Sequence, residues 1–438
     1  MNKLYYEFIG TPIYPQLTKG QKDFFEAVFK GQNLFLTGSA GTGKSFCLKT
    51  LFDFTKNTDF QIAKTASTGI AALTIGGSTI HSFAGLGLGD ENVQSIIANI
   101  KKYKKARSRI TNVKRLCIDE ISMIDSAMLD KIDIIFKYFR GNNNPFGGVQ
   151  MIFLGDMLQL PPVLRNKFHE GATFCFESRA WKEANVKVCH LTEIKRQDAN
   201  SDFAIALNQI RFGDTNGLKV IMDRDGDFFE KDLVKPIKLF PINKNVDSYN
   251  QQKYNEIKGS EFVFHAVEFG EDRHLQQLDK NCLAPKTLYL KVGVQVLLLS
   301  NLDTEHGWVN GTLAKVVGIE NNLPVIQRDN GDKIIVDKDE WTIKETTILP
   351  NGDTVYPVIA SRKQIPLKLG YAITIHKSQS LTLDKVEIDF LGCFEHAQVY
   401  VALSRARSLN GLSIRNLKAS YVKAHPKCID FYSSIHRG

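Results

Sequence analysis

The sequence predicts an α/β protein with parallel sheets and a small all-β insertion in its second half. Three observations support this fold class. Apolar runs at residues 34–36, 116–118 and 149–154 each lead into glycine or acidic residues, as buried parallel strands do. Residues 46–52 carry apolar side chains at helical spacing. Asn-Gly pairs, which favour tight hairpins, lie between β-prone runs within residues 287–358.

The first apolar run continues into LTGSAGTGKSF, residues 36–46, which matches the P-loop pattern. The loop lies between a strand and a helix N-terminus, where free N–H groups and the helix dipole favour phosphate. Lys44 is expected to reach the β and γ phosphates, and Ser45 to coordinate Mg²⁺. The alternative is a glycine-rich turn without a ligand. The pattern predicts ATP and Mg²⁺ as cofactors, held by Gly38, Ala40, Gly41, Thr42, Gly43, Lys44 and Ser45.

Composition limits the class of protein. The chain has 438 residues, enough for two or three domains, with 56 Lys and Arg against 47 Asp and Glu. The net charge of +9 favours a polyanionic partner but also fits a solubility feature. Neither a long apolar run nor a secretory N-terminus is present, so we expect an intracellular protein without a membrane partner, cytoplasmic if bacterial or viral. The scattered cysteines are expected to be buried small residues rather than a disulfide scaffold or a zinc site.

The second apolar run ends in Asp119 and Glu120, and the third leads into a loop that contains Gln159. The carboxyl ends of parallel strands meet at one sheet edge, where α/β proteins bind ligands. Asp119 is therefore a candidate Mg²⁺ ligand, and Glu120 a candidate for polarising the attacking water. Gln159 is positioned to contact the γ-phosphate. The alternatives are a solvated strand end and a polar loop residue before the Pro-Pro pair.

Gln21 lies upstream of the first strand, in LTKGQ. Its amide can pair with adenine at N6 and N7. Thr18 and Gln21 also have the spacing of a capping box at a helix N-terminus. We expect the adenine contact, with the capping box as the alternative.

Two Ser/Thr-rich loops, residues 64–72 and 76–83, offer hydroxyl and backbone donors. Such donors can hold a sugar-phosphate backbone without reading bases, and Thr68, Thr79 and His81 are the candidate contacts. Helix capping is the alternative. The basic run KKYKKARSR, residues 101–109, fits either nucleic-acid contact or a solvated face.

Taken together, these motifs resemble the superfamily 1B helicases, most closely the petite-integration-frequency family. The resemblance covers nearly the whole chain and includes GSAGTGKS, TASTGIAA, IDEISM, GDMLQLPPV, LTEIKRQ, IHKSQSLTLD and QVYVALSRARSLNGL in the family's order. Residues 121–140 are similar to the family's signature segment. They predict an amphipathic helix that packs on the sheet through Met128, Leu129, Ile132, Ile135, Phe136 and Phe139.

The resemblance assigns roles to residues in the second half. Arg196 and Arg405 are similar to family arginines that reach the γ-phosphate from the facing domain, an arginine-finger arrangement. His376, Lys377 and Gln379 match a family segment that contacts the DNA backbone and the ATP interface. One position departs from the pattern: Ser380 stands where the family usually has Gly.

The resemblance also implies a domain plan of two RecA-like domains that share one ATP site. We expect the first domain at 1–200 with a small insertion at about 84–112, the second at 201–286 and 359–438, and a β-rich insertion of the Src-homology-3 type at 287–358. Within that insertion, Trp308 is expected in a core or hairpin contact, with base stacking as the alternative.

The expected function is an ATP-dependent DNA helicase that moves on single-stranded DNA and unwinds tailed or forked duplexes as a monomer. Resemblance implies 5′ to 3′ travel. The alternatives are an RNA helicase of the same superfamily, a non-motor P-loop protein such as a nucleotide kinase or switch, and a basic nucleic-acid-binding protein with a vestigial ATPase.

Overall fold

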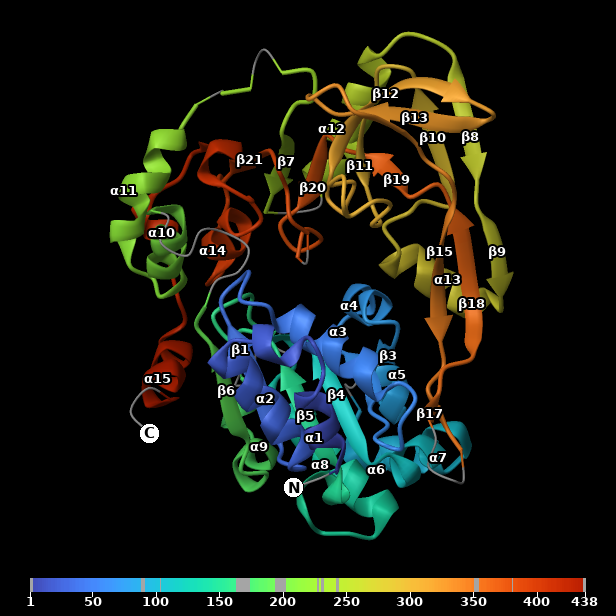
Figure 1. Cartoon of the computed structure of the whole chain (residues 1–438), viewed down its shortest axis with the longest axis vertical. Coiled ribbons are helices and arrows are strands. Elements are labelled where there is room, and N and C mark those ends of the chain that lie inside the picture. Colours follow the sequence, from blue (N-terminus) through green and yellow to red (C-terminus); the bar gives the residue numbers. More distant parts are fainter. Residues whose placement is uncertain are drawn as a thin grey trace. The chain divides into compact units, whose positions relative to one another are not determined.

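The structure, a computed structural model, describes residues 3–87, 91–102, 104–162, 174–193, 202–226, 228–229, 232–241, 244–349, 354–379 and 381–435 (Figure 1). The chain divides into two compact units. The first comprises Met1–Met157, Pro161–Arg196 and Thr342–Ile359. The second comprises Leu158–Leu160, Gln197–Trp341 and Ala360–Gly438. Residues 342–358, which the sequence analysis assigned to the β-rich insertion, are thus grouped with the first unit, and so is Ile359.

A six-stranded sheet with order β3-β2-β4-β5-β1-β6 forms the centre of the first unit (Figure 1). Every pairing in it is parallel, which confirms the predicted α/β class. The three apolar runs of the sequence are its central strands. The strands are β1 (Leu34–Gly38), β2 (Ala63–Ala66), β3 (Ser78–Thr79), β4 (Arg115–Asp119), β5 (Gln150–Leu154) and β6 (Lys187–Leu191).

Alternate residues of these strands face opposite layers of helices. Leu34 and Leu36 join a core with the first three helices, while Phe35 contacts Trp181 on the other face. Phe153 stacks on the same indole at a ring separation of 5.2 Å. The described helices are α1 (Lys3–Ile9), α2 (Lys19–Phe29), α3 (Lys44–Thr55), α4 (Gly69–Thr74), α5 (Ile80–Ala84), α6 (Val93–Lys102), α7 (Lys104–Asn112), α8 (Ser126–Arg140) and α9 (Arg179–Glu183).

Helix α8 is the amphipathic helix expected from residues 121–140. Met128 and Phe139 are half-buried, and the helix buries Leu129, Ile132, Ile135 and Phe136. Its apolar face also carries a carboxylate: Asp133 is fully buried, accepts a hydrogen bond of 2.7 Å from the Phe146 N–H, and pairs with Lys137 at 2.8 Å. The predicted amphipathic helix is confirmed, and packing of its apolar face on the sheet stays a prediction. The buried charge is held because both of its oxygens have partners.

The second unit contains a four-stranded parallel sheet with order β20-β7-β21-β22. Helices α10, α11 and α14 contribute side chains to the same core as β7, β21 and β22. The strands of this sheet are β7 (Ile237–Phe240), β20 (Ala372–Thr374), β21 (Val386–Asp389) and β22 (Leu412–Arg415). The described helices are α10 (Asp202–Arg211), α11 (Leu218–Ile221), α12 (Lys244–Glu256), α13 (Asp272–Asn281), α14 (Gln398–Leu403) and α15 (Pro426–Ile435).

Antiparallel strands make up the β-rich part of the chain. They form a five-stranded sheet with order β14-β13-β12-β11-β19, a β8–β10 pair and a β15-β18-β9 sheet. Trp308 is 3% exposed in this core, so the expected core contact is confirmed. The strands are β8 (Glu261–His265), β9 (Val267–Gly270), β10 (Thr287–Lys291), β11 (Gln295–Leu298), β12 (Leu313–Glu320), β13 (Leu323–Gln327), β14 (Lys333–Ile335), β15 (Asp339–Lys344), β18 (Val358–Gln364) and β19 (Leu367–Leu369).

The Asn-Gly pairs have different outcomes. Asn330–Gly331 turns between β13 and β14, as predicted, with Gly331 at φ +90°. Asn310–Gly311 lies in a longer connection between β11 and β12, and Asn351–Gly352 lies outside the described residues. Sequence analysis missed the two-residue turn at Asn321–Asn322, where both asparagines have positive φ and join β12 to β13.

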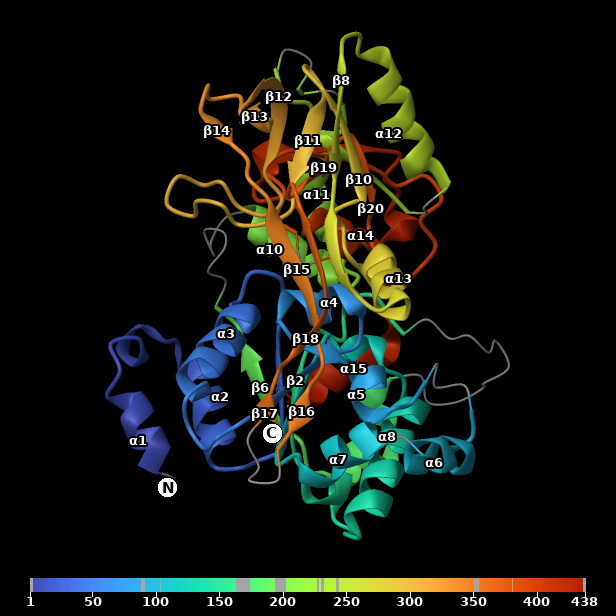
Figure 2. The same ribbon diagram turned by 90° about the vertical axis from the view of Figure 1, so that its right-hand side faces the viewer.

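Strands β15 and β18 continue into a hairpin of β16 (Thr347–Ile348) and β17 (Thr354–Val355), which we call the arm (342–359) (Figure 2). In the arm, Glu345 pairs with Lys105 at 2.8 Å and with Arg109 at 3.1 Å. The Tyr356 hydroxyl donates to the Ile62 carbonyl at 2.7 Å. The basic run at 101–109 is therefore mixed: Arg109 is buried in a structural ion pair, whereas Lys101, Lys102 and Lys104 are exposed.

Candidate functional site

The P-loop connects β1 to α3, as the sequence predicted. Gly38 ends the strand, and Gly43 precedes the helix with φ +94°. A Cβ atom on Gly38 would lie 2.5 Å from the Leu191 carbonyl oxygen and 2.6 Å from the Thr42 hydroxyl, and one on Gly43 would lie 2.8 Å from the Gln21 amide nitrogen. Close packing against backbone therefore requires glycine at position 38, and the positive φ favours it at position 43.

The side chains of the loop fit a triphosphate and its cation. The Lys44 ammonium donates to the carbonyls of Gly38 and Ser39, at 2.6 and 3.0 Å, so it lies over the loop. Ser45 is exposed at the start of α3, where its hydroxyl would join the Mg²⁺ ligands. Ala40 and Gly41 are half-buried and lie in the turn between β1 and α3. Bound Mg²⁺ would neutralise phosphate charge; the chain's own residues provide the ammonium, the backbone donors and the hydroxyl.

Gln21 forms the capping box of α2. Its amide oxygen accepts from the Thr18 N–H at 3.0 Å, and its own N–H donates to the Thr18 hydroxyl at 3.3 Å. The capping alternative is confirmed. The amide nitrogen faces the P-loop at Gly43, so the oxygen and the nitrogen of this one amide have different surroundings. The adenine contact stays a prediction.

Asp119 and Glu120 lie at the carboxyl end of β4. Glu120 adopts the left-handed conformation, φ +53° and ψ +44°, and its N–H donates to the Asp119 carboxylate at 2.9 Å. This conformation is uncommon outside glycine and is held here by surrounding hydrogen bonds. Burial and the neighbouring Glu120 carboxylate raise the pKa of Asp119 to about 7, although Lys44 opposes the shift. Two adjacent carboxylates that repel each other provide a favourable site for a divalent cation.

Ser67 joins this pair to the first Ser/Thr-rich loop. Its N–H donates to the Asp119 carbonyl at 3.0 Å, and its hydroxyl donates to the Glu120 carbonyl at 2.8 Å. The next residue, Thr68, is a candidate strand contact. Sequence analysis did not single out Ser67; the signal that could have found it is its position directly after β2, which neighbours β4 in the sheet.

The candidate strand contacts Thr68 and Thr79 are N-cap residues. The Thr68 hydroxyl accepts from the Ala71 N–H, and the Thr79 hydroxyl accepts from the Ser82 N–H, both at 3.2 Å. The capping alternative is confirmed for both. His81 follows, half-buried in the short helix α5. Contact of these residues with a strand stays a prediction.

Two further candidates are Gln159 and Arg196. Gln159 is half-buried in the segment that follows β5. Arg196 lies outside the described residues, and its role as an arginine finger stays a prediction.

In the second unit, the loop after β20 carries the other strand-contact candidates. Lys377 is exposed, whereas His376 and Gln379 are half-buried. The His376 Nε2 atom lies 3.7 Å from the Glu395 carboxylate. Ser380, the departure from the family pattern, lies outside the described residues.

Arg405 is 4% exposed and contacts that same loop. Its guanidinium donates to the carbonyls of Ser378 and Leu381, at 3.4 and 3.5 Å. It also donates to the Val401 carbonyl at 2.9 Å and to the Ser404 hydroxyl at 2.8 Å. Thus a nucleotide-contact candidate touches a strand-contact loop in this unit, as Asp119 and Glu120 do through Ser67 in the first.

Comparison with known proteins places these motifs in a family. Residues 16–219 match the model of PIF1-like helicase, and residues 273–319 match that of the DNA helicase Pif1 2B domain. The human ATP-dependent DNA helicase PIF1 (Homo sapiens) is 37% identical over 97% of this chain.

Among the described residues, no helix combines the length and apolar character that a bilayer crossing requires.

Solved structures give the same result. Pif1 helicase from Candida albicans, known from a crystal structure, is 38% identical in sequence to this chain, with a TM-score of 0.72. The match covers 96% of this chain and 99% of that one. Pif1 helicase from Bacteroides, in complex with ADP-AlF3 and single-stranded DNA, is 29% identical with a TM-score of 0.62, covering 96% and 97%. The chain spans 64% of the length of the human protein. It belongs to the PIF1-like helicase family.

Proposed function

We propose that the protein is an ATP-dependent DNA helicase. In this proposal it uses ATP and Mg²⁺, moves 5′ to 3′ on single-stranded DNA as a monomer, and unwinds tailed or forked duplexes. The observation that carries the proposal is the paired coupling: in each unit a strand-contact loop is hydrogen-bonded to a nucleotide-contact residue. The Bacteroides relative solved with a nucleotide analogue and single-stranded DNA supports both ligands.

At the nucleotide, the first unit provides binding and water activation. Lys44 leaves its carbonyl partners to meet the phosphates, while Gly38, Ala40, Gly41, Thr42 and Gly43 supply the backbone around them. Ser45 and Asp119 hold the cation, and Glu120 orients the attacking water. Gln159 contacts the γ-phosphate, and Gln21 contacts adenine through its free amide nitrogen.

Arg405 links hydrolysis to movement in this proposal. To reach a γ-phosphate, its guanidinium must leave the Ser378 and Leu381 carbonyls, which removes two contacts to the loop that carries His376, Lys377 and Gln379. A charge-assisted hydrogen bond contributes roughly 1.5–3 kcal/mol, so Arg405 and Arg196 together supply about 3–6. Changing an equilibrium from mostly open to mostly closed takes about 5.5 kcal/mol, which is compatible.

The loops that contain Thr68, Thr79 and His81 provide the second grip on the strand. When one grip moves relative to the other in each ATP cycle, the strand advances, by about one nucleotide in family analogy. Separating one duplex step costs about 1.4 kcal/mol of stacking on average. This is less than the free energy available from the two arginines.

The test is ATP hydrolysis with and without single-stranded DNA. We expect stimulation by the strand, loss of unwinding with retained strand binding in Lys44→Ala, and a much slower rate in Arg405→Ala. A normal rate in Arg405→Ala would refute the finger assignment. Displacement from 5′-tailed and 3′-tailed duplexes measures polarity, and sedimentation measures the oligomeric state.

An RNA helicase is the second candidate, because loops that contact the phosphate backbone do not identify the sugar. Matched DNA and RNA oligonucleotides in the same hydrolysis assay separate the two. Stronger stimulation and displacement with RNA would replace the DNA assignment.

A further inference from the structure

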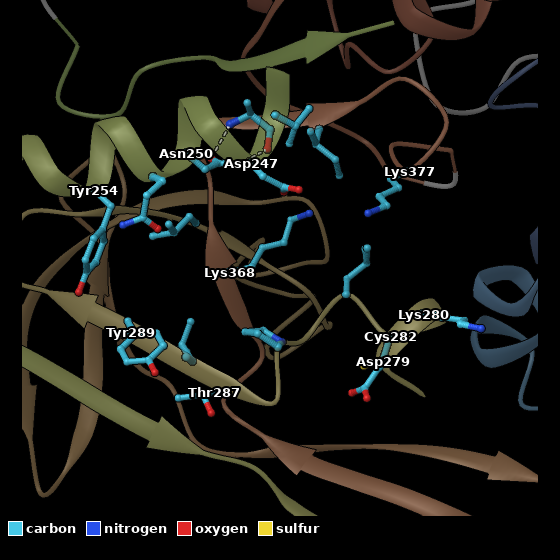
Figure 3. Close-up of a pocket in the computed structure, with 18 of the residues that line it drawn as sticks. Asp247, Asn250, Tyr254, Asp279, Lys280, Cys282, Thr287, Tyr289, Lys368 and Lys377 are labelled. Atoms are coloured by element: carbon cyan, nitrogen blue, oxygen red, sulfur yellow. Dashed lines mark hydrogen bonds between the residues drawn. The ribbon is translucent and has the colours of Figure 1, made fainter. Parts of the chain in front are cut away.

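The second unit contains a cavity of about 570 Å³, to which the motifs above contribute Lys377. Its walls come from segments far apart in the sequence: Asp247 and Asn250 from α12, Tyr289 from β10, and Lys368 and Lys377 from β19 and the loop after β20 (Figure 3). The volume lies within the range of ligand pockets, roughly 300–1,000 Å³.

Hydrogen bonds hold the walls in place. The Asn250 side chain bonds both backbone groups of Ala372, each at 2.9 Å, which fixes α12 to β20 (Figure 3). The Tyr254 hydroxyl donates to Glu261 at 2.6 Å. The cavity is therefore a feature of packed elements rather than a gap between loose loops.

Two lysines converge on this cavity (Figure 3). Leu367 is fully buried in the β-rich core, so Lys368, the next residue of β19, projects to the opposite side. Neither the Lys368 nor the Lys377 ammonium has a hydrogen bond or an ion pair with another described residue. Burial and the nearby Lys377 lower the pKa of Lys368 to about 8, and Asp247 opposes the shift.

Other charged groups at the cavity are already engaged or directed elsewhere. Asp279 pairs with Arg362, and Glu261 accepts from Tyr254. Lys280 points away from the cavity (Figure 3). The remaining charges are the two ammonium groups and Asp247, which leaves an excess of positive charge.

Tyr289 supplies an aromatic surface at the same cavity. Its side chain is 49% exposed, and its ring has no aromatic or cationic partner among the described residues. A base can stack on an exposed tyrosine whatever its sequence, because every base has a π face. Cationic and aromatic groups in one cavity are the combination that a nucleotide needs.

We propose that this cavity binds a nucleotide unit, with the phosphate group between Lys368 and Lys377 and the base against Tyr289. The same chemistry is offered by a free nucleotide and by one unit of a bound strand. We favour the strand, because Lys377 belongs to the loop proposed to contact DNA. The strand source rests on the proposed function, whereas phosphate binding at the cavity does not.

Selective acylation of lysines in the full chain tests the proposal. Peptide mapping by mass spectrometry at pH 8 gives the modification rate of Lys368, with exposed Lys363 as the internal reference. Thymidine, thymidine monophosphate and a thymidine oligonucleotide are the probes. We expect the oligonucleotide, and at higher concentration the monophosphate, to slow Lys368 modification about tenfold without slowing Lys363, while thymidine has no effect.

The outcomes distinguish the sources. Protection by the monophosphate alone supports a free-nucleotide site and refutes the strand source. Protection by the oligonucleotide alone supports the strand source. No protection by either phosphate-bearing probe, while anisotropy shows that the oligonucleotide binds, overturns the proposal. Failure of the oligonucleotide to bind at all counts against the proposed function, and the monophosphate still tests the cavity.

A matched pair of variants separates direct contact from shielding by a distant strand. Lys368→Met should weaken oligonucleotide binding about tenfold relative to Lys363→Met and reduce the salt dependence by about one phosphate contact. Equal affinities and equal salt slopes for the two variants would refute the contact.

Discussion

Each unit holds a pair of like charges close together, and the two pairs have opposite sign. In the first unit, Asp119 and Glu120 are consecutive residues at the end of β4, and burial together with the Glu120 charge raises the pKa of Asp119 to about 7. In the second, Lys368 and Lys377 face one cavity, and the pKa of Lys368 is lowered to about 8. Both pKa shifts mean that the folded protein disfavours the charged form of the group.

Like charges in a packed structure cost free energy, which a ligand of opposite charge recovers. The arm offers the contrasting case, because Glu345 is neutralised by Lys105 and Arg109 within the protein. A pair of like charges whose pKa shift disfavours the charged form is therefore a better sign of a ligand site than a charged cluster as such. The acidic pair suits a divalent cation, and the basic pair suits a phosphate group.

The largest expected effect is on catalysis by the acidic pair. Glu120→Gln keeps the size of the side chain but removes the base that polarises water. We expect ATP hydrolysis to fall by about 10²–10⁴-fold, as is typical when a general base is lost. The measurement is the steady-state hydrolysis rate in the presence of single-stranded DNA.

Nucleotide affinity provides the control for that variant. Binding of a non-hydrolysable ATP analogue should stay within a few fold, because the P-loop and Lys44 are unchanged. A hydrolysis rate close to that of the wild type would show that Glu120 is only a structural strand end. Only the basic pair would then be a candidate ligand site.

Sequence reasoning found the acidic pair but not the basic one, for a physical reason. Asp119 and Glu120 are adjacent and follow an apolar strand after a P-loop, so a contiguous pattern predicts their place at the sheet edge. Lys368 and Lys377 meet only because β19, β20 and α12 pack together. The parallel sheets and helix α8 were likewise local patterns, and the caps at Thr68 and Thr79 are local bonds that the sequence offered as an alternative. The arm's contact with α7 required tertiary structure, because Arg109 and Glu345 are 236 positions apart in the chain.

The second prediction concerns the stability of the first unit without Mg²⁺. The pKa of Asp119 is near 4 in the unfolded chain and about 7 in the folded one, so its contribution to stability is lost as pH rises through this interval. Asp119→Asn should therefore stabilise the first unit by about 2–4 kcal/mol at pH 8, and by much less near pH 4. Hydrogen exchange of β1, β4 and β5 in a chelator measures this gain.

Addition of Mg²⁺ tests whether the cation binds at Asp119. The cation should stabilise the wild type at pH 8 because it binds the folded carboxylates, and it should have less effect on Asp119→Asn. An equal response of the two proteins would mean that the cation binds elsewhere.

The third prediction is the counterpart in the second unit, with the opposite dependence on pH. The ordinary lysine pKa is near 10.4, and that of folded Lys368 is about 8, so the folded state disfavours the charged side chain most strongly below pH 8. Lys368→Met should stabilise the second unit by about 1–3 kcal/mol at pH 7, and the gain should shrink as pH rises from 8 to 10.

Hydrogen exchange of β19 and β20 measures this gain in stability. The control is Lys363→Met, whose stability we expect within about 0.5 kcal/mol of the wild type. A stability gain that is the same at pH 7 and pH 10 would assign the effect to apolar packing of methionine, and Lys368 would not be a counterpart of Asp119.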